Sequence, residues 1–310
     1  MEKFFFKKNR TPSFAESQNH GILNNIAINR GKIMDLESYF NTGAGREIMD
    51  IAYSVFPGIP GNSEIHFREA IRRGFHGLKA DMRLSRDGEI ILCHDDGYTF
   101  DEAGRITAFE QNCRTAIRDL SAKEILKLRF AATYGGVAHA PCTLETMLGL
   151  CRDSGRIAYL TLRSCESWRA ETIVRMTELL RRFEMTGRTI INIFPPGFPE
   201  AVRMVDDLCP GLRYCNTMEQ DTPLNEQIIE DSAARGFRII CLCGLTDGAF
   251  DPALAVRAAA AGIHIWCWGL ETREALTDAV RRGATGFQMY MPEGTVGLLA
   301  EMFPGRISLS

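Results

Sequence analysis

Eight short runs of β-forming residues, each followed by a segment with helical spacing, constrain the fold of this chain more than any other feature. The runs span 51–55, 75–82, 157–163, 189–194, 212–216, 237–242, 263–268 and 285–290. Regular alternation of strands and helices is typical of parallel sheets, because a helical crossover brings the chain back to begin the next parallel strand. Eight such repeats close the sheet on itself, so the pattern predicts a (β/α)8 TIM barrel of the α/β class.

Residues with well-defined preferences at helix ends support the predicted helices. Asn62-Ser63 precedes the segment EIHFREAIRR, and Gly74 follows it. Serine and asparagine favour the N-cap position, and glycine favours the position after the last helical turn. Pro199 and Pro252 stand where first helical positions are expected, which suits a residue without a backbone N–H.

The pattern also predicts the domain organisation. Residues 1–48 are polar and irregular, so we expect an N-terminal arm, followed by a single barrel domain over 49–310. The segment 89–142 is one large insertion after the second strand, entered through the turn Asp87-Gly88. Within it, Ser121 and Glu124 have the spacing of a capping box, which predicts a helix there.

Composition excludes several classes of protein. The formal net charge of −3 and a pI near 6.1 leave no broad positive surface for nucleic acid. No apolar run is long enough for a secretory signal or a membrane span, so we expect a cytoplasmic protein. The ten cysteines are then expected to be reduced thiols. Cys241 and Cys243 form the only close pair, and no second pair follows to complete a metal site.

In TIM barrels, functional side chains lie where the strands end at their carboxyl termini. By this rule the candidates at the barrel mouth are Ser54, Lys79, Asp81, Arg163, the loop 195–197, and Trp266 or Trp268. His94-Asp95 ends the hairpin that rises from the second strand, so we expect it near the mouth as well.

Several of these residues resemble the core of the glycerophosphodiester phosphodiesterase family. The likeness is carried by Asp81, Asp87-Gly88 and His94-Asp95, and by the tail 263–292, which resembles the closing tryptophan strand, helix and strand-proline of that family. It extends from about Ile51 to Pro292. The resemblance implies an eight-stranded α/β barrel that cleaves glycerol-phospho-alcohols with a divalent cation, Ca²⁺ or Mg²⁺.

The chain departs from the family pattern at most of the site motifs. The resemblance places the opening His-Arg-Gly of the family at Tyr53-Ser54-Val55, where none of the three residues is kept. The Pro-Glu-Asn-Thr motif falls at 60–63 and lacks its glutamate. The Glu-x-Asp metal pair falls at Lys79-Ala80-Asp81, and the later metal glutamate falls at Thr161. The His-Asp motif is intact as His94-Asp95.

These departures predict that the usual metal site is lost. Ca²⁺ and Mg²⁺ take oxygen ligands and are held largely by carboxylate charge. Asp81 is the only remaining family ligand, and the ammonium of Lys79 would repel a cation. We therefore expect no bound Ca²⁺ or Mg²⁺ and no other cofactor.

Two functions are compatible with this residue set. We expect His94 to be the only candidate acid–base group, with Lys79, Arg163, Asp95, Asn62 and Trp266 as candidates for binding substrate or an anion. One function is recognition of a small-molecule phosphodiester or phosphate without turnover, as in a pseudoenzyme. The other is a metal-independent phosphodiesterase or phosphodiester lyase in which Lys79 and Arg163 act as fixed cations. A third possibility is an enzyme for other substrates on the same barrel, because a fold does not fix its function.

Overall fold

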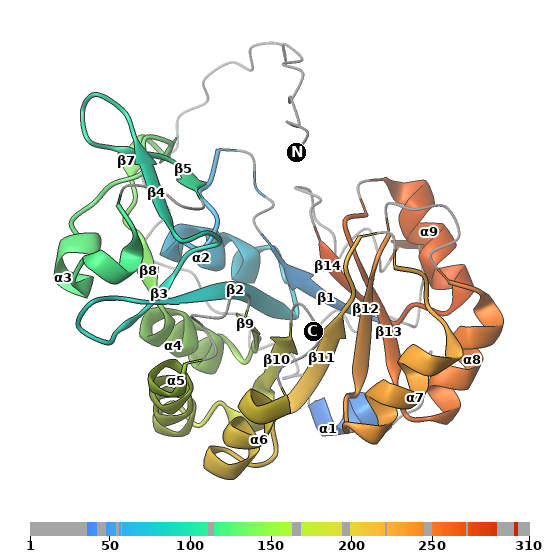
Figure 1. Cartoon of the computed structure of the whole chain (residues 1–310). Helices are drawn as coiled ribbons and strands as arrows, with labels where there is room; N and C mark the ends of the chain where they lie inside the picture. The colour runs from blue at the N-terminus through green and yellow to red at the C-terminus, as the bar shows by residue number, and fades with distance from the viewer. Residues whose placement is uncertain are drawn as a thin grey trace.

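The fold is a closed barrel of eight parallel strands. The computed structural model describes residues 36–41, 48–53, 56, 58–110, 115–162, 169–193, 199–220, 222–244, 250–270, 272–289 and 301–302. The barrel strands are β1 (Met49–Ala52), β2 (Gly77–Leu84), β9 (Ile157–Leu162), β10 (Thr189–Ile193), β11 (Arg213–Thr217), β12 (Ile239–Cys243), β13 (His264–Trp268) and β14 (Gly286–Met289). Neighbouring strands pair in parallel, and β1 pairs with both β14 and β2, which closes the barrel (Figure 1). The predicted TIM barrel is confirmed.

Helices follow the strands and surround the barrel (Figure 1). They are α2 (Glu64–Arg72), α4 (Leu144–Ser154), α5 (Ala170–Arg182), the 3₁₀ turn η2 (Thr186–Arg188), α6 (Pro199–Leu208), α7 (Glu226–Ala234), α8 (Pro252–Ala260) and α9 (Arg273–Arg282). The predicted ends of α2 are confirmed: the Ser63 side chain accepts a hydrogen bond from the backbone N–H of His66, and Gly74 has a positive φ of 87°. Pro199 and Pro252 begin α6 and α8.

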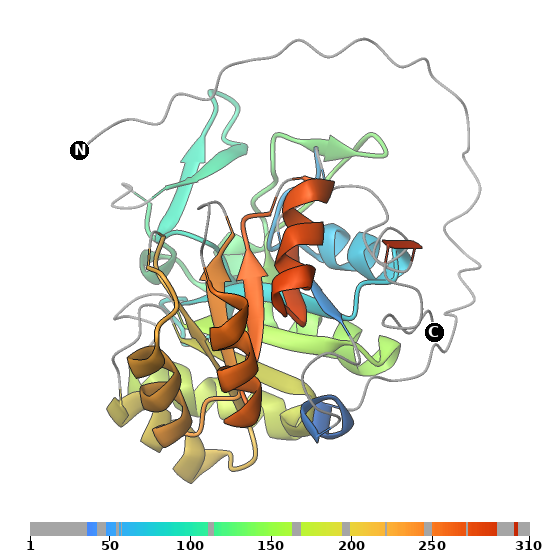
Figure 2. The same ribbon diagram turned by 90° about the vertical axis from the view of Figure 1, so that its right-hand side faces the viewer.

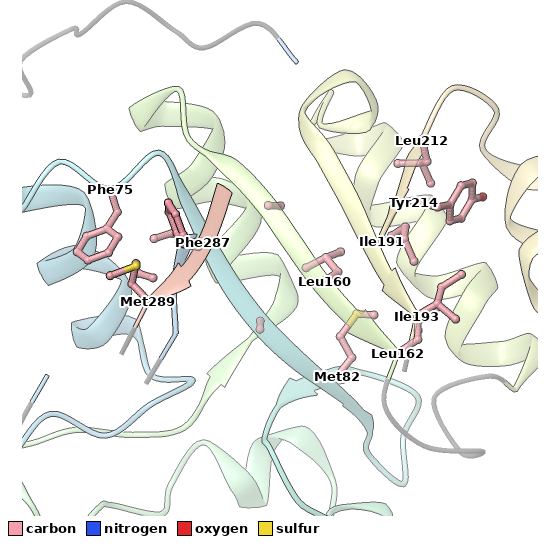
Figure 3. Close-up of a cluster of buried hydrophobic side chains, with 14 of the residues drawn as sticks. Phe75, Met82, Leu160, Leu162, Ile191, Ile193, Leu212, Tyr214, Phe287 and Met289 are labelled. Atoms are coloured by element: carbon pink, nitrogen blue, oxygen red, sulfur yellow. The ribbon is translucent and has the colours of Figure 1, made fainter. Parts of the chain in front are cut away.

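Two hydrophobic layers hold the barrel together. Side chains on the outer face of the strands pack against the helices, and Figure 3 shows this layer around Leu160 and Leu162 of β9 and Ile191 and Ile193 of β10. Alternate residues of the same strands point into the barrel, as the pleat of a β-strand requires. The buried interior cluster includes Ile51, Tyr159, Ile190, Cys215, Cys241 and Trp266. The interior of the barrel is therefore a packed core.

The insertion forms a small unit with its own hydrophobic cluster. It contains β3 (Ile90–Leu92), β4 (Gly97–Phe100), β5 (Ile106–Glu110), η1 (Ile117–Asp119), α3 (Ala122–Ile125), β6 (Thr133–Tyr134), β7 (Val137–Ala138) and β8 (Cys142–Thr143). Strand β3 runs antiparallel to β2 and β8. The predicted capping box of Ser121 and Glu124 is confirmed at the start of α3. The hairpins β4–β5 and β6–β7 lie at the end of the barrel to which the strand arrowheads point (Figure 2).

A short helix, α1 (Leu36–Asn41), packs on the opposite end of the barrel (Figure 2). Leu36, Tyr39 and Phe40 are buried, at the i, i+3, i+4 spacing of one helix face. The Tyr39 hydroxyl donates to the carbonyl oxygen of Thr285 at 2.8 Å. The expectation of an irregular arm over 1–48 is thus corrected for residues 36–41, whose apolar face has a place in the core. Residues 1–35 and 42–47 lie outside the described residues.

None of the described helices is long and apolar enough to cross a membrane.

Candidate functional site

The centre of the candidate site is a buried ion pair on β2. Successive side chains of a strand point to opposite faces, so Lys79 and Asp81 lie on the same face, inside the barrel. The Lys79 Nζ lies 3.0 Å from Asp81 Oδ1 and 3.2 Å from Oδ2. The two side chains are only 5% and 0% exposed. The lysine therefore neutralises the carboxylate on which the family's metal site would depend.

Asn62 and Tyr53 both contact this pair. The Asn62 side chain donates to Asp81 Oδ2 at 3.5 Å and accepts from the backbone N–H of Asp81 at 3.2 Å. Asn62 has a φ of 53°, a left-handed conformation that asparagine tolerates better than most residues. The ring of Tyr53 faces the ammonium of Lys79, 3.6 Å from the ring centroid, a cation–π contact. Residues from three segments thus fix one buried ammonium and one buried carboxylate.

His94 and Asp95 lie on the same side of the mouth and are partly exposed. The His94 Nδ1 lies 3.0 Å from Asp95 Oδ1, with side-chain exposures of 25% and 18%. An ionised carboxylate only accepts hydrogen bonds, so Nδ1 is the nitrogen that carries the proton in this contact. The ring centroids of Tyr53 and His94 are 6.2 Å apart. The structure therefore brings together Asn62, Lys79, Asp81, His94 and Asp95, with Tyr53 between the ion pair and the histidine.

Two residues of this cluster, Tyr53 and Arg83, were not among the site residues expected from the sequence. Tyr53 stands where the resemblance places the first histidine of the family. Arg83 continues the alternation of Lys79 and Asp81 along β2, a period-two signal that could have identified it. Its guanidinium donates to the carbonyl oxygens of His94 and Asp95, each at 2.9 Å.

Among the described residues, a group of neutral polar side chains lies in the barrel interior beside the ion pair. Thr217 donates to Asn192 Oδ1 at 2.5 Å, and the Asn192 amide donates to Thr161 Oγ1 at 3.3 Å. The Gln288 amide donates to the hydroxyl of Tyr159 at 2.8 Å. Thr161, which stands where the resemblance places a metal glutamate, is therefore a member of a satisfied hydrogen-bond network.

Trp266 lies in the barrel core. Its side chain is fully buried, stacks on Tyr159 with ring centroids 5.8 Å apart, and donates from Nε1 to the Tyr39 hydroxyl at 3.1 Å. The Tyr39 contact comes from α1, at the end of the barrel opposite the mouth. The expectation of a binding role for Trp266 is corrected on this ground, because the ring faces a helix that covers the amino ends of the strands. Trp268, two residues further along β13, is nearer the mouth and only half-buried.

Arg163, Ser54 and the loop 195–197 lie outside the described residues. The structure therefore gives no position for Arg163 relative to Lys79 and His94.

The described residues around Asp81 do not fit a Ca²⁺ or Mg²⁺ ion. Such an ion needs several oxygen ligands, usually with more than one carboxylate. Here the Asp81 carboxylate is paired with an ammonium, and the interior neighbours Thr161 and Asn192 are neutral. Throughout the described part of the chain, no group of three or more His, Cys, Asp or Glu side chains could hold a metal.

The cysteines in the described segments are free, buried thiols. Burial raises the pKa of Cys267 to about 12, and it raises the pKa of Cys241 well above the ordinary thiol value. A thiol must lose its proton to bind a metal strongly. Cys241 and Cys243 therefore act as packing residues of β12.

Comparisons with known proteins agree with the fold and with the family resemblance. The model of the glycerophosphoryl diester phosphodiesterase family matches residues 58–289. A glycerophosphodiester phosphodiesterase of Caldanaerobacter subterraneus subsp. tengcongensis is 21% identical over 248 residues, which cover 78% of this chain and 93% of the relative.

Solved structures of similar proteins show the same fold. A phosphodiesterase of Oleispira antarctica, in complex with the product sn-glycerol-3-phosphate, superposes with a TM-score of 0.65 at 17% identity, over 81% of this chain and 96% of the other. A glycerophosphoryl diester phosphodiesterase of Parabacteroides distasonis gives a TM-score of 0.65 at 15% identity, over 88% and 94%. Because the family model covers most of the barrel, this chain belongs to the glycerophosphoryl diester phosphodiesterase family.

Proposed function

We propose that this protein recognises a phosphodiester or another phosphate-bearing small molecule at the barrel mouth and lacks the metal-dependent hydrolysis of its family. One observation carries the proposal: the ammonium of Lys79 lies within 3.0 and 3.2 Å of both oxygens of Asp81. A divalent cation at this carboxylate would have to displace a buried lysine and would be repelled by its charge.

Phosphate is the proposed ligand because the mouth offers hydrogen-bond donors and cations. A protonated His94, oriented by Asp95, can donate to a phosphate oxygen, and hydrogen bonds to charged partners are the strong ones. Lys79, and Arg163 from the sequence, would add fixed positive charge. The relative from Oleispira antarctica is seen with sn-glycerol-3-phosphate, which makes glycerol phosphates the first compounds to test.

A second candidate function is metal-independent cleavage of a phosphodiester. The 3.0 Å contact between His94 and Asp95 favours it, because a carboxylate on Nδ1 fixes the tautomer and leaves Nε2 in the acceptor form. In this mechanism His94 would accept a proton from the attacking hydroxyl or donate one to the leaving oxygen, while the fixed cations stabilise negative charge on the phosphoryl oxygens.

We further propose a cytoplasmic protein connected with lipid metabolism. The free, buried thiols of the described cysteines support a reducing compartment. The glycerol-phospho-alcohol substrates implied by the family resemblance support the metabolic role.

Phosphorus NMR on a panel of glycerophosphodiesters, with Mg²⁺, with Ca²⁺ and with a chelator, separates these functions. Binding without turnover in every condition supports the first, and turnover in the chelator supports the second. Turnover that appears only with added metal contradicts both. If cleavage occurs, His94→Ala should lower the rate by about 10²–10⁴-fold. Full activity in that variant would show that His94 is structural.

Thermal melts test the part that Lys79 plays in phosphate binding. A ligand at 100 times its Kd stabilises the folded state by about 2.7 kcal/mol. Lys79→Met should reduce this gain, whereas the exposed control Lys127→Met should keep it. An undiminished gain in Lys79→Met would mean that Lys79 serves only Asp81.

A further inference from the structure

Arg83 is the third residue in the alternating series on β2, and its guanidinium is almost completely enclosed. It stands two residues beyond Asp81, and its side chain is 4% exposed. From there Nε donates to the carbonyl oxygen of Asp95 and Nη2 donates to that of His94, each at 2.9 Å. The same Nη2 lies 3.6 Å from a carboxylate oxygen of Asp96. One buried cation therefore contacts three consecutive residues of the segment that carries His94.

Arg83 contacts the backbone around His94 at the point where the β2–β3 ladder has ended. The last link between the two strands is the backbone N–H of Cys93, which donates to the carbonyl of Asp81 at 2.9 Å. Beyond the segment, the carbonyl of Asp96 accepts from the backbone N–H of Ile117 at 2.9 Å. Between these two anchors, the carbonyls of His94 and Asp95 are held by Arg83.

We propose that Arg83 is a positioning residue for the candidate site, acting through His94 and Asp95. A planar guanidinium offers several N–H donors in a rigid arrangement, so it can fix two adjacent carbonyls in one orientation. That orientation sets the directions of both side chains, including the 3.0 Å contact between His94 Nδ1 and Asp95 Oδ1. The inference rests on the proposed function for its consequence in binding, but the geometric part can be tested without a ligand.

The tautomer of His94 reports on this geometry. In the neutral ring, an intact contact with Asp95 keeps the proton on Nδ1. Nitrogen NMR of protein with labelled histidine, at about pH 9 where imidazole is neutral, measures the fraction of each tautomer. His94→Gln identifies the His94 signals. We expect the Nδ1–H form to predominate in the unaltered protein and its fraction to fall in Arg83→Lys. This variant keeps the positive charge but loses the planar guanidinium with its several N–H donors.

Two further variants show whether the effect passes through the proposed contact. Asp95→Asn should lower the Nδ1–H fraction. Adding Arg83→Lys to it should lower the fraction no further, since both changes act on the same contact between His94 and Asp95. Arg86→Lys is the matched control: Arg86 lies on the same hairpin, is 58% exposed, and donates to the Asp119 carbonyl at 2.9 Å. It should leave the His94 signals unchanged.

Three results would overturn the inference. The first is a folded Arg83→Lys with an unchanged tautomer, and the second is an equal effect of Arg86→Lys. The third applies even if Arg83→Lys does not fold: an unchanged tautomer in Asp95→Asn would show that the contact does not control the ring.

Calorimetry with sn-glycerol-3-phosphate extends the test to function. Arg83→Lys should weaken binding by about tenfold, the cost of roughly one well-placed hydrogen bond, while Arg86→Lys should bind normally. If the unaltered protein binds neither sn-glycerol-3-phosphate nor any compound of the glycerophosphodiester panel, the proposed function fails, and the tautomer measurement still decides whether Arg83 positions His94. If it binds and Arg83→Lys binds equally well, the inference fails and the proposed function stands.

Discussion

Both ends of the barrel hold buried polar side chains, but the two ends differ in chemistry. At the amino end, α1 covers Trp266 and His264, and Tyr39 stacks on the His264 ring at 4.6 Å. Burial, with a contribution from the charge of Arg238, lowers the pKa of His264 to about 4, so this ring is neutral at pH 7. At the carboxyl end, Lys79 and Asp81 form an ion pair that is 5% and 0% exposed.

This difference is the one expected between an end that stabilises the barrel and an end that carries a site. A neutral aromatic cluster gains free energy from burial of apolar surface and from satisfied hydrogen bonds. In a buried ion pair, the attraction between the charges must offset the free energy lost when both charges are removed from water. Such a pair is therefore weak evidence for stability. In TIM barrels the amino end generally serves stability and the carboxyl end carries function. The positions of the Tyr39 and Lys79 clusters agree with that division.

The largest expected effect comes from breaking the ion pair. Lys79→Met leaves the Asp81 carboxylate buried without its cation, so we expect a loss of about 3–5 kcal/mol in the free energy of unfolding at pH 7. Urea denaturation measures it. The double variant Lys79→Met with Asp81→Asn should recover most of the loss, because no unpaired charge remains. No recovery would mean that Lys79 stabilises the mouth by packing, for instance on Tyr53.

The next effect concerns the amino end. Tyr39→Ala removes a buried ring and leaves the Trp266 indole N–H without its acceptor, so we expect a loss of about 3 kcal/mol. Tyr39→Phe keeps the ring and removes only the hydrogen bonds of the hydroxyl, so it should lower the free energy of unfolding by about 1 kcal/mol. Val256→Ala, at a position 70% exposed, serves as the control and should stay within about 0.5 kcal/mol. Glycerol phosphate binding should survive in Tyr39→Phe. Its loss there would contradict the separation of the two ends.

Acidification should lower the stability of the folded protein through His264 at the amino end of the barrel. The pKa of His264 is about 4 in the folded protein, below the ordinary value of 6.5. Between these values the unfolded chain binds a proton that the folded chain does not, so stability is lost as the pH falls from about 7 to about 4. The loss is on the order of 2–3 kcal/mol.

The variant His264→Asn isolates this contribution. Burial also lowers the pKa of His66 to about 4, so a second histidine contributes to the acid sensitivity. Denaturation at a series of pH values gives the slope of the free energy of unfolding against pH. In His264→Asn we expect about half of the part of this slope that the histidines cause to be lost. A slope equal to that of the unaltered protein would show that the ring becomes protonated without loosening α1.

The smallest effect should distinguish two roles of Asn62. Asn62→Ala removes its hydrogen bonds to Asp81 and places at a φ of 53° a residue that tolerates the left-handed region less well than asparagine, with an expected cost of about 1–2 kcal/mol. Asn62→Gly removes the same hydrogen bonds but accepts the positive φ freely. If both variants lose equal stability, the hydrogen bonds account for the effect. If glycine is tolerated, backbone conformation is the main reason for asparagine at this position.

The sequence by itself determined the eight strands, the ends of α2 and the capping box of α3, because strand alternation and helix capping act over a few residues. It also predicted that Lys79, Asp81, His94 and Asp95 lie near one another, since all four lie on or beside one hairpin. Only the tertiary structure decided the rest. Tyr39 and Thr285 are 246 positions apart, so no local pattern could place α1 beneath the barrel or turn Trp266 toward it. Likewise, the roles of Asn62 and Arg83 depend on atoms that come together only when the mouth has formed.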